Sequence, residues 1–372
     1  MIGTRKKGIV AVGMSGGVDS SVAAALLKKQ GYEVIGVYFI TSDQTTSGKI
    51  RDNICCSLES MMDARKVAQQ LGCKFYTVNL RTVFKEKVFD DFIKEYESGR
   101  TPNPCIHCNK FVKFGEALRK VKLLGADYLA TGHYARIKKT LKHKNIKTGK
   151  QESRYIYRLF EGKDKNKDQT YFLHTLGQDQ LAHIMFPLGK LTKPKVRKIA
   201  AKFNLPTASK VESQEICFIP DGDVANFLRQ HIDFKSGDIF DIETKEKVGE
   251  HDGLQAFTVG QRKGIGLPGG PWYVAKLDIR KSVLYVTKNI DLIYKKQMKV
   301  RNIHWIVGES KLPAKIQVKI RYNSDPVAVT VQSKEGDDYI VEFDKPQKAI
   351  TPGQSAVFLK KDECLGGGII EG

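Results

Sequence analysis

Residues 8–21 read GIVAVGMSGGVDSS, and this stretch decides the fold. The run GIVAVGM is short, apolar and bounded at both ends, which is typical of a buried parallel strand. Gly16 and Gly17 then permit a tight turn, and the apolar spacing from Val22 to Leu27 predicts a helix that stops at Gly31. A glycine turn between a strand and a helix directs backbone N–H groups and the positive helix end at one place.

The loop GMSGGVDSS (13–21) is therefore expected to bind a phosphate or pyrophosphate. Ser15, Ser20 and Ser21 add hydroxyl donors. The loop is not a Walker A motif because no Lys follows the glycines, and the Rossmann pattern G-x-G-x-x-G is also absent. The alternative is a plain strand–turn–helix joint in which Asp19 or Ser20 caps the helix.

Strand-like and helix-like segments alternate through the first two hundred residues. We expect further strands at 32–39, 74–80 and 126–133, and helices at 61–72 and 111–125. In the last helix the predicted buried face comprises Phe111, Phe114, Leu118 and Val121. This alternation predicts an α/β domain in which helices cover both faces of a parallel sheet.

The C-terminal part has a different pattern. Apolar residues alternate with polar ones at 315–322, 326–332 and 338–344, which indicates an antiparallel barrel or sandwich. A Gly-rich, mixed region that includes GQRKGIGLPGG lies between the two parts and has no assignable regular structure. We therefore predict three domains, at residues 1–210, 211–285 and 286–372, and the small central one contains Cys217.

The 372 residues have a formal net charge of +21, which indicates a polyanionic partner such as nucleic acid rather than a merely soluble basic protein. From Lys138 to Lys167 there are eleven Lys and Arg against three acidic residues. This stretch is expected to form a solvated basic hairpin or loop, or else an insertion without a partner.

The composition also bears on the compartment. Seven cysteines are too few for a disulfide scaffold in a chain of this length. No apolar run approaches the ~18 residues of a membrane span, and GIVAVGM is too short for a signal peptide. We expect a cytoplasmic protein without membrane contact, whose cysteines are thiols, metal ligands or catalytic groups.

Two cysteine motifs stand out. TPNPCIHCNKF (101–111) places Cys105 and Cys108 on the first turn of a predicted helix, whose N-terminus is expected to lower their thiol pKa values. The pair is open to interpretation as a redox dithiol, a cluster ligand pair or half a zinc site, although zinc needs two further ligands. Cys217, in ESQEICFIPDGD (212–223), is by itself typical of a buried small hydrophobic residue.

Seven motifs, in order, then resemble one family: SGGVDSS, TPNPC-x-x-CN, ATGHYAR, KDQTYFL, SQEICFIP, GQRKGIGL and KIRYN. Along essentially the full chain they are similar to the tRNA-specific 2-thiouridylases of the ATP pyrophosphatase superfamily. The resemblance implies an ATP pyrophosphatase (adenine nucleotide alpha-hydrolase-like) domain, a small central domain and a C-terminal antiparallel β-barrel. It also implies that ATP and Mg²⁺ activate the C2 oxygen of the wobble uridine (position 34) in tRNA for Lys, Glu and Gln, and that sulfur displaces AMP.

The resemblance also implies roles for individual residues. Cys108 would be the nucleophile, and Cys217 would carry a persulfide loaded by a sulfur-donor protein, so that a Cys108–Cys217 disulfide remains to be reduced. The expected ATP-binding positions are Gly13, Met14, Ser15, Gly16, Gly17, Val18, Asp19, Ser20, Phe39 and Gly132. The expected contacts to the target base and tRNA are Asn103, Pro104, Cys105, His133, Lys167, Asp168, Gln169, Arg321, Tyr322 and Gln354. For Tyr322, a place in the barrel core is the alternative.

This sequence departs from the family pattern at two positions. Many members have Met where Phe39 stands and Asp where Cys105 stands. Cys105 cannot act as a carboxylate, and with Cys108 and Cys217 it makes three thiols that could hold a [4Fe–4S] cluster, the alternative to a persulfide relay. Two other functions stay open: adenylation of a small metabolite, and a non-catalytic RNA-binding protein with a relic nucleotide loop.

Overall fold

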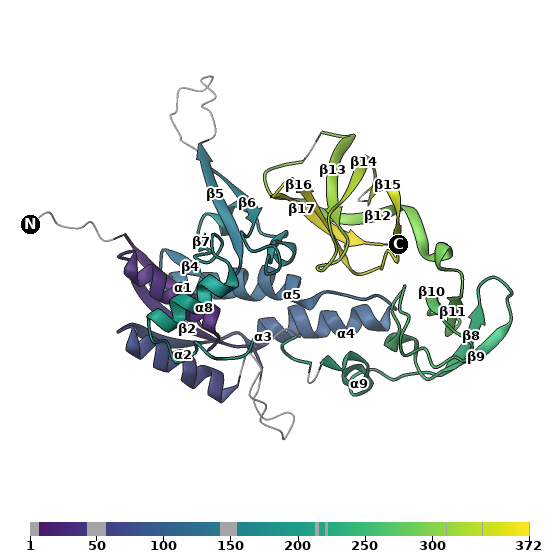
Figure 1. Ribbon diagram of the computed structural model, residues 1–372, viewed down its shortest axis with the longest axis horizontal. Coiled ribbons are helices and arrows are strands. Elements are labelled where there is room, and N and C mark those ends of the chain that lie inside the picture. The colour runs from purple at the N-terminus through teal and green to yellow at the C-terminus, as the bar shows by residue number, and fades with distance from the viewer. Residues whose placement is uncertain are drawn as a thin grey trace, which may run out of the picture.

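The computed structural model describes residues 7–42, 57–141, 155–212, 216–219, 222–309, 311–336 and 338–371. In Figure 1 a sheet covered by helices forms one end of the molecule, a β-barrel lies beside it, and a smaller sheet forms the opposite end. This arrangement confirms the predicted α/β pyrophosphatase-type domain, central domain and C-terminal barrel. None of the helices in these ranges is long and apolar enough to cross a membrane.

The first sheet is entirely parallel, with the strand order β3-β2-β1-β4-β7. Its strands are β1 (Ile9–Gly13), β2 (Glu33–Ile40), β3 (Lys74–Asn79), β4 (Tyr128–Ala130) and β7 (Ile184–Met185). Val10 and Val12 pack with α1 (Val18–Lys29), α2 (Leu58–Gln70) and α8 (Lys193–Lys202), whereas Ala11 packs with the helices of the other face. Successive side chains of a strand point to opposite faces, so the short apolar run of β1 is buried on both.

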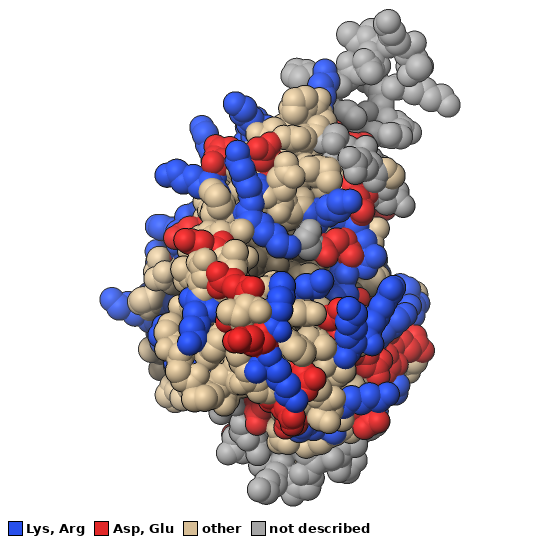
Figure 2. Space-filling model, turned by 90° about the vertical axis from the view of Figure 1, so that its right-hand side faces the viewer, with Lys and Arg blue, Asp and Glu red and all other residues tan. Residues whose placement is uncertain are grey.

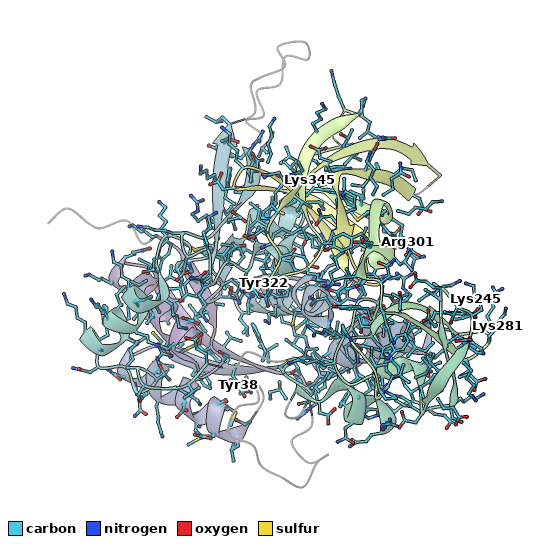
Figure 3. All side chains as sticks on the ribbon, turned by 45° about the vertical axis from the view of Figure 1, so that its right-hand side comes forward. Tyr38, Lys245, Lys281, Arg301, Tyr322 and Lys345 are labelled. Atoms are coloured by element: carbon cyan, nitrogen blue, oxygen red, sulfur yellow. The ribbon has the colours of Figure 1, made fainter. Side chains whose placement is uncertain are left out.

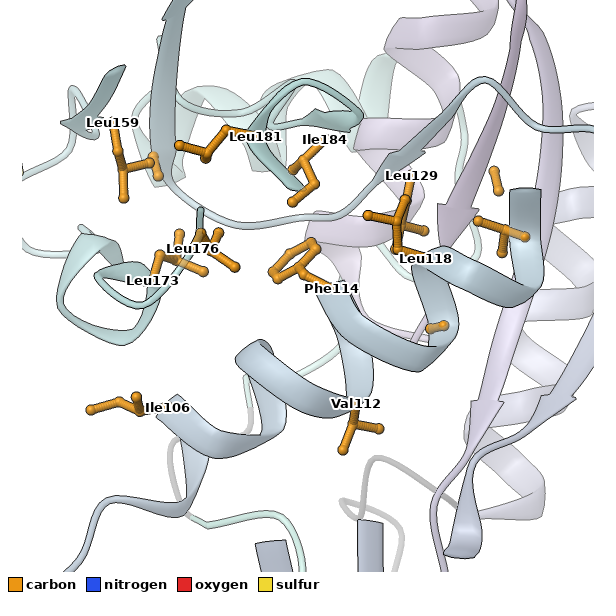
Figure 4. Packing of buried hydrophobic residues seen from close by; sticks show 14 of the residues in the cluster. Ile106, Val112, Phe114, Leu118, Leu129, Leu159, Leu173, Leu176, Leu181 and Ile184 are labelled. Atoms are coloured by element: carbon orange, nitrogen blue, oxygen red, sulfur yellow. The ribbon is translucent and has the colours of Figure 1, made fainter. Parts of the chain in front are cut away.

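The other face is covered by helices that run from Arg81 to Glu97 and from Pro104 to Leu123. The first is made of α3 (Arg81–Phe84), η1 (Lys85–Phe89) and α4 (Asp90–Glu97), and the second of α5 (Pro104–His107), η2 (Cys108–Ala117) and α6 (Leu118–Leu123). Both η1 and η2 are π-helical. Figure 4 shows Val112, Phe114 and Leu118 directed into the core.

The predicted buried face of the second helix is wrong at one position. Phe111 is only half-buried, and Val112 is fully buried in its place. In a π-helix the bonds run from i to i+5, so residues five apart, such as Val112 and Ala117, share a face. The α-helical spacing used for the prediction therefore selects the wrong neighbour at the start of η2.

A hairpin of β5 (Ala135–Leu141) and β6 (Tyr155–Glu161) rises from this domain and pairs through β6 with the barrel strand β17. These two strands confirm the predicted basic hairpin, and residues 142–154 of the basic stretch lie outside the described residues. Arg136 and Arg158 are paired with Asp362 and Glu363 of the barrel, at 2.7 and 2.8 Å. The remaining short elements of the domain are η4 (Thr170–Leu173) and α7 (Gln178–Leu181).

Six antiparallel strands form the C-terminal barrel in the order β12-β15-β14-β13-β16-β17, and pairing of β12 with β17 closes it. Their bounds are β12 (Tyr294–Trp305), β13 (Ala314–Lys319), β14 (Val327–Glu335), β15 (Asp338–Lys348), β16 (Ser355–Lys360) and β17 (Glu363–Ile370). Alternate residues such as Val318, Val329 and Val341 fill its interior. The period-two pattern in the sequence thus predicted the inward face of these strands, except at Tyr322, which packs against the cluster of the first domain.

The central domain contains α9 (Val224–Arg229) and a four-stranded sheet with the order β10-β11-β8-β9. These strands are β8 (Gly237–Asp241), β9 (Lys247–His251), β10 (Tyr273–Asp278) and β11 (Val283–Thr287), with short turns η6 (Leu254–Ala256) and η7 (Ile290–Ile293). GQRKGIGLPGG (260–270) contains neither helix nor strand, and its neighbour Trp272 packs in the core of this sheet.

Candidate functional site

The SGGVDSS loop lies at the carboxyl edge of the parallel sheet, where β1 has β2 on one side and β4 on the other. Ligands of open α/β sheets bind at such a switch point. Gly16 has a φ of +73°, and a Cβ built on it would lie 2.3 Å from the carbonyl oxygen of Ser60. Gly17 is the N-cap of α1, and no side chain caps the helix, so the alternative of an Asp19 or Ser20 cap is wrong. The first N–H groups of α1 thus lack a capping side chain.

Two of the expected ATP-binding positions that are distant in sequence, Phe39 and Gly132, converge on this loop. A Cβ on Gly132 would lie 2.8 Å from the backbone nitrogen of Ser20, and one on Gly13 would lie 2.9 Å from Cε2 of Phe39. Glycine at these two positions lets the loop after β4 and the Phe39 ring approach closely. Ser15 is exposed, whereas Met14 and Val18 are buried and pack in the hydrophobic cluster of α1 and α2. The Oγ atoms of Ser20 and Ser21 donate to the carbonyl of Gly17 at 3.1 and 2.9 Å.

Asp19 does not face outward from the loop. Its carboxylate accepts from Lys193 Nζ at 2.7 and 2.8 Å and from the Tyr134 hydroxyl at 2.8 Å. Lys193 also lies 3.1 Å from Glu212. Lys193, Tyr134 and Glu212 are residues that sequence reasoning missed. No local pattern pairs Lys193 with Asp19, which is 174 positions away.

The C-x-x-C motif begins a helix, as predicted. Asn103 is the N-cap of α5, and its Oδ1 accepts from the backbone N–H of Cys105 at 3.2 Å, while Pro104 is buried in the first turn. Burial nevertheless raises the pKa of the Cys105 thiol, only partly offset by the charge of Lys113. The predicted lowering of the thiol pKa is therefore wrong for Cys105, because desolvation disfavours the thiolate.

Cys108 and Cys217 flank the same helical layer. Cys108 begins η2 and packs against the core cluster that contains Phe84 of α3. The neighbour of Cys217 in the chain, Phe218, packs against that cluster too, and its ring centroid lies 5.6 Å from that of Phe84. Two segments that are distant in sequence thus pack against the same hydrophobic cluster.

The three thiols do not form a metal site in this structure. Among the described residues, no three or more His, Cys, Asp or Glu side chains are grouped so that they could hold a metal ion. Cys105, Cys108 and Cys217 are all within the described ranges. Their arrangement thus fits neither zinc, which takes four ligands, nor a three-cysteine cluster.

Lys167, Asp168 and Gln169 join the foot of the β5–β6 hairpin to the loop after β4. Lys167 pairs with Glu212 at 2.7 Å. The buried Asp168 accepts from the Gly162 N–H at 2.8 Å and from the Thr170 hydroxyl at 2.6 Å, and Gln169 Oε1 accepts from the Tyr134 N–H at 3.1 Å. In this structure all three expected tRNA contacts bind other parts of the protein.

The barrel contributes Arg321, Tyr322 and Gln354. Tyr322 lies in the turn after β13, its ring centroid 4.4 Å from that of Phe172, so the alternative of a barrel-core residue is wrong. Figure 3 shows it in the middle of the molecule. Phe172 in turn accepts from Asn109, the residue after Cys108, at 3.2 Å. Tyr322 is thus linked through two contacts to the start of η2.

Arg321 makes a contact within the barrel, whereas Gln354 ties the barrel to a neighbouring segment. Arg321 Nη2 donates to the Ala349 carbonyl at 2.6 Å, and Gln354 Nε2 donates to the Thr101 carbonyl at 2.6 Å. Thr101 is the first residue of the TPNPC motif, and its N–H donates to the Pro352 carbonyl at 2.9 Å. The barrel therefore lies directly against the segment that leads into α5.

His133 is buried between Phe114 and Phe186, with ring centroids 5.7 and 5.8 Å away. Its Nδ1 is 2.7 Å from the Thr131 hydroxyl. Burial, together with the charge of Lys113, holds the pKa of His133 well below its usual value. The ring is therefore neutral at physiological pH.

A second buried imidazole makes stability depend on pH. Burial and the nearby His304 lower the pKa of His174 to about 3, and neither ring nitrogen has a hydrogen-bond partner within the described chain. Both His133 and His174 titrate near 6.5 when unfolded, so their contribution is fully present above that pH and is lost as the pH falls toward the folded values. Between pH 7.5 and 5.5, we expect the free energy of unfolding to drop by about 1.4 kcal/mol for each histidine.

Urea unfolding at a series of pH values measures this drop. His174→Phe keeps a ring without a titratable nitrogen, so it should remove about half of the dependence. An unfolding free energy that stays constant across this range would contradict the assignment of two neutral buried histidines.

Comparison with known proteins covers nearly the whole chain. Residues 8–221 match a family model described as the tRNA methyl transferase HUP domain, residues 225–288 its PRC-barrel domain, and residues 295–370 an aminomethyltransferase beta-barrel domain. The chain is 45% identical over 372 residues to the tRNA-specific 2-thiouridylase MnmA 2 of Caldanaerobacter subterraneus subsp. tengcongensis, covering 99% of both chains. It is 43% identical to the MnmA of Shouchella clausii, covering 97% of this chain and 96% of that protein.

Solved structures are more distant. The U34-tRNA thiolase NcsA from Methanococcus maripaludis with its [4Fe-4S] cluster is 19% identical, with a TM-score of 0.33 over 61% of this chain and 64% of that one. At that level of similarity, no property of its site is transferred to this chain.

Proposed function

This chain belongs to the tRNA-specific 2-thiouridylase family, and from that premise we propose that it is an ATP-dependent tRNA-uridine 2-sulfurtransferase. Its substrate is the wobble uridine, position 34, of tRNA for Lys, Glu and Gln. The observation that supports this most strongly is the convergence of Gly132 and Phe39 on the SGGVDSS loop, because a glycine turn beside an apolar ring suits an adenine nucleotide, in a chain similar throughout to a tRNA-specific 2-thiouridylase. We place the enzyme in the cytoplasm.

ATP fits the switch point of the sheet. Its phosphates would meet the backbone N–H groups of Gly16 and Gly17 and the start of α1, which favour negative charge. The Phe39 ring offers an apolar surface for adenine. Mg²⁺ would arrive bound to the phosphates, since the carboxylate of Asp19 is engaged by Lys193. The loop thereby holds ATP with its α-phosphate open to attack by the C2 oxygen of uridine.

The chemistry then proceeds in two balanced steps. The C2 oxygen displaces pyrophosphate from ATP, which leaves an adenylated uridine. The terminal sulfur of a Cys217 persulfide attacks C2, AMP leaves with the oxygen, and the Cys108 thiolate breaks the S–S bond to the transferred sulfur. A Cys108–Cys217 disulfide results, and a thiol reductant must supply two electrons to restore both cysteines. A soft sulfur nucleophile and a good leaving group suit this displacement.

Basic side chains on the hairpin support a polyanionic substrate. Lys138 and Lys139 of β5 are exposed and lie over the rings of Phe160 and Tyr155, at 4.2 and 3.6 Å. Figure 2 shows further Lys and Arg side chains spread over one face of the molecule, with acidic ones between them. Lysines bind RNA phosphates and exposed tyrosines stack on unpaired bases, so the hairpin and barrel offer tRNA a broad contact.

The test is reconstitution from the purified protein, unmodified tRNA, ATP, Mg²⁺ and a persulfide donor. Mass spectrometry of the nucleosides should show 2-thiouridine, and omission of ATP should abolish it. AMP formation that is stimulated by a small metabolite, with no 2-thiouridine in any tRNA, would contradict the proposal.

A further inference from the structure

The short joint between α4 and α5, residues 99–101, is held by both of the other domains. A Cβ built on Gly99 would lie 2.5 Å from Cδ1 of Ile279 in the central domain. The Thr101 hydroxyl lies 3.1 Å from that of Thr258, which also belongs to the central domain. The barrel holds Thr101 through two hydrogen bonds to its backbone, at 2.9 and 2.6 Å. The place where two helices of the first domain meet is therefore fixed from outside that domain.

Arg100, in the middle of the joint, forms a bidentate ion pair with the barrel. Its Nη1 and Nη2 atoms donate to the two carboxylate oxygens of Glu371 at 2.8 and 2.9 Å, and its Nε donates to Glu95 of α4 at 2.7 Å. Only 14% of the Arg100 side chain is exposed, so solvent ions screen the pair weakly. A bidentate arginine–carboxylate pair fixes direction as well as distance. Because Glu371 directly follows β17, the pair sets the barrel against the end of α4.

Helix α4 and the η1 turn before it support the segment that carries Cys217. Phe218, the next residue in the chain, has its ring centroid 5.4 Å from that of Phe92 in α4 and 6.0 Å from that of Phe89 in η1. Consecutive Cα atoms are about 3.8 Å apart. The backbone of Cys217 is therefore held close to the α4 side of the joint.

Helix α5 carries the other thiol of the proposed relay. Cys108 is the C-cap of α5, and the helix starts at Pro104, three residues after Thr101. His107 Nδ1 lies 2.9 Å from the Asp91 carboxylate of α4, so the two helices also contact each other directly. Since so few residues separate the joint from α5, a shift of the joint is passed on to Cys108.

We propose that Arg100 and Glu371 are positioning residues for sulfur transfer. Their ion pair lets the barrel set the angle between α4 and α5, and with it the distance between the Cys108 and Cys217 thiols. The consequence for catalysis rests on the function proposed above. Two cysteines join only when their Cα atoms come within about 4.4–6.8 Å, and a misplacement of about 1 Å can slow a reaction by up to about a hundred-fold. Without the pair, α4 and α5 keep their mutual contact but lose the barrel as a reference.

Glu371→Gln removes one charge and leaves Glu95 as the counterion of Arg100, so the buried guanidinium stays paired. In the reconstituted reaction, we expect kcat for 2-thiouridine to fall at least about ten-fold. The KM for tRNA should stay within about two-fold, because phosphate contacts supply most of the affinity. Glu371→Asp should restore part of kcat. Arg100→Lys lacks the guanidinium fork, and adding it to Glu371→Gln should cost little more, since both remove the same contact.

Glu363→Gln is the matched control. Glu363 also joins the barrel to the first domain, through Arg158 at 2.8 Å, and 15% of its side chain is exposed against 23% for Glu371. That pair holds the β5–β6 hairpin and not the α4–α5 joint, so this variant should keep kcat and KM. Equal losses of kcat in the two variants, or a lowered melting temperature with parallel loss of tRNA binding in Glu371→Gln, would overturn the positioning role.

Oxidation of the protein alone gives a readout without tRNA or ATP. Diamide takes two electrons and two protons from the Cys108 and Cys217 thiols and leaves a disulfide, which peptide mass spectrometry follows over time. We expect this disulfide to form at least about ten-fold more slowly in Glu371→Gln than in wild type or Glu363→Gln, with alkylation of each thiol by iodoacetamide unchanged.

An unchanged rate of oxidation in Glu371→Gln, or a wild-type protein that forms no such disulfide, would overturn the positioning role. Slower oxidation of the variant, when wild type makes no 2-thiouridine in any tRNA, would instead uphold that role and reject the proposed function.

Discussion

Cys217→Ser should lose 2-thiouridine formation by at least about a thousand-fold, since a hydroxyl cannot carry a persulfide sulfur. Binding of tRNA should be nearly unchanged, because the substitution replaces one sulfur atom by oxygen and the neighbouring Phe218 keeps its contact with Phe84. Adenylation should also persist, so AMP should still form. Reconstituted thiolation, gel-shift titration of tRNA and AMP release measure the three outcomes on one preparation.

Cys108→Ser should be equally inactive but for a different reason. Without the Cys108 thiolate the S–S bond to the transferred sulfur is not broken, so with tRNA and ATP the uridine should stay linked to Cys217 through that sulfur, visible as a protein–tRNA adduct that a thiol reductant releases. Cys73→Ser is the control, since Cys73 packs with a different hydrophobic cluster, that of α1 and α2. Normal thiolation by either Cys108→Ser or Cys217→Ser would remove that residue from the proposed relay.

Gly16→Ala should abolish ATP binding. The φ of +73° disfavours any L side chain, and the new Cβ would lie 2.3 Å from the Ser60 carbonyl oxygen, which belongs to backbone and cannot rotate away. The loop must therefore shift, and the N–H groups that would cradle the phosphates shift with it. We expect ATP affinity, measured by calorimetry, and AMP formation to fall at least about a hundred-fold.

Gly31→Ala is a control that introduces backbone strain at a positive φ without a steric clash like the one between a Cβ at Gly16 and the Ser60 carbonyl oxygen. Gly31 ends the turn after α1 with a φ of +88°, and nothing lies within 4 Å of a Cβ built there. This control should lose about 1 kcal/mol of unfolding free energy and keep its ATP affinity. Equal ATP affinity in the Gly16 and Gly31 variants would contradict the assignment of the loop.

Much of the fold was predictable because its signals are local. The bounded apolar runs of β1 and β2 marked buried parallel strands, and alternation at 315–344 marked barrel strands with one buried face. Prediction failed where the backbone departs from standard periodicity. The π-helical η2 buries Val112 in place of Phe111, and the irregular GQRKGIGLPGG stretch has no period from which to predict.

By itself, the sequence determined which reactive groups the chain carries: a glycine loop between strand and helix that suits a phosphate, and Cys108 and Cys217 within motifs similar to those of the 2-thiouridylases. These follow from residue type and spacing along the chain, which folding does not change. Only the tertiary structure decided which charged side chains are paired and which titratable side chains are buried away from water. It turned Asp19 toward Lys193, paired Glu212 with the same lysine, raised the pKa of the Cys105 thiol, and enclosed His133. Pairing and desolvation depend on neighbours that folding brings from distant positions, and no local pattern encodes them.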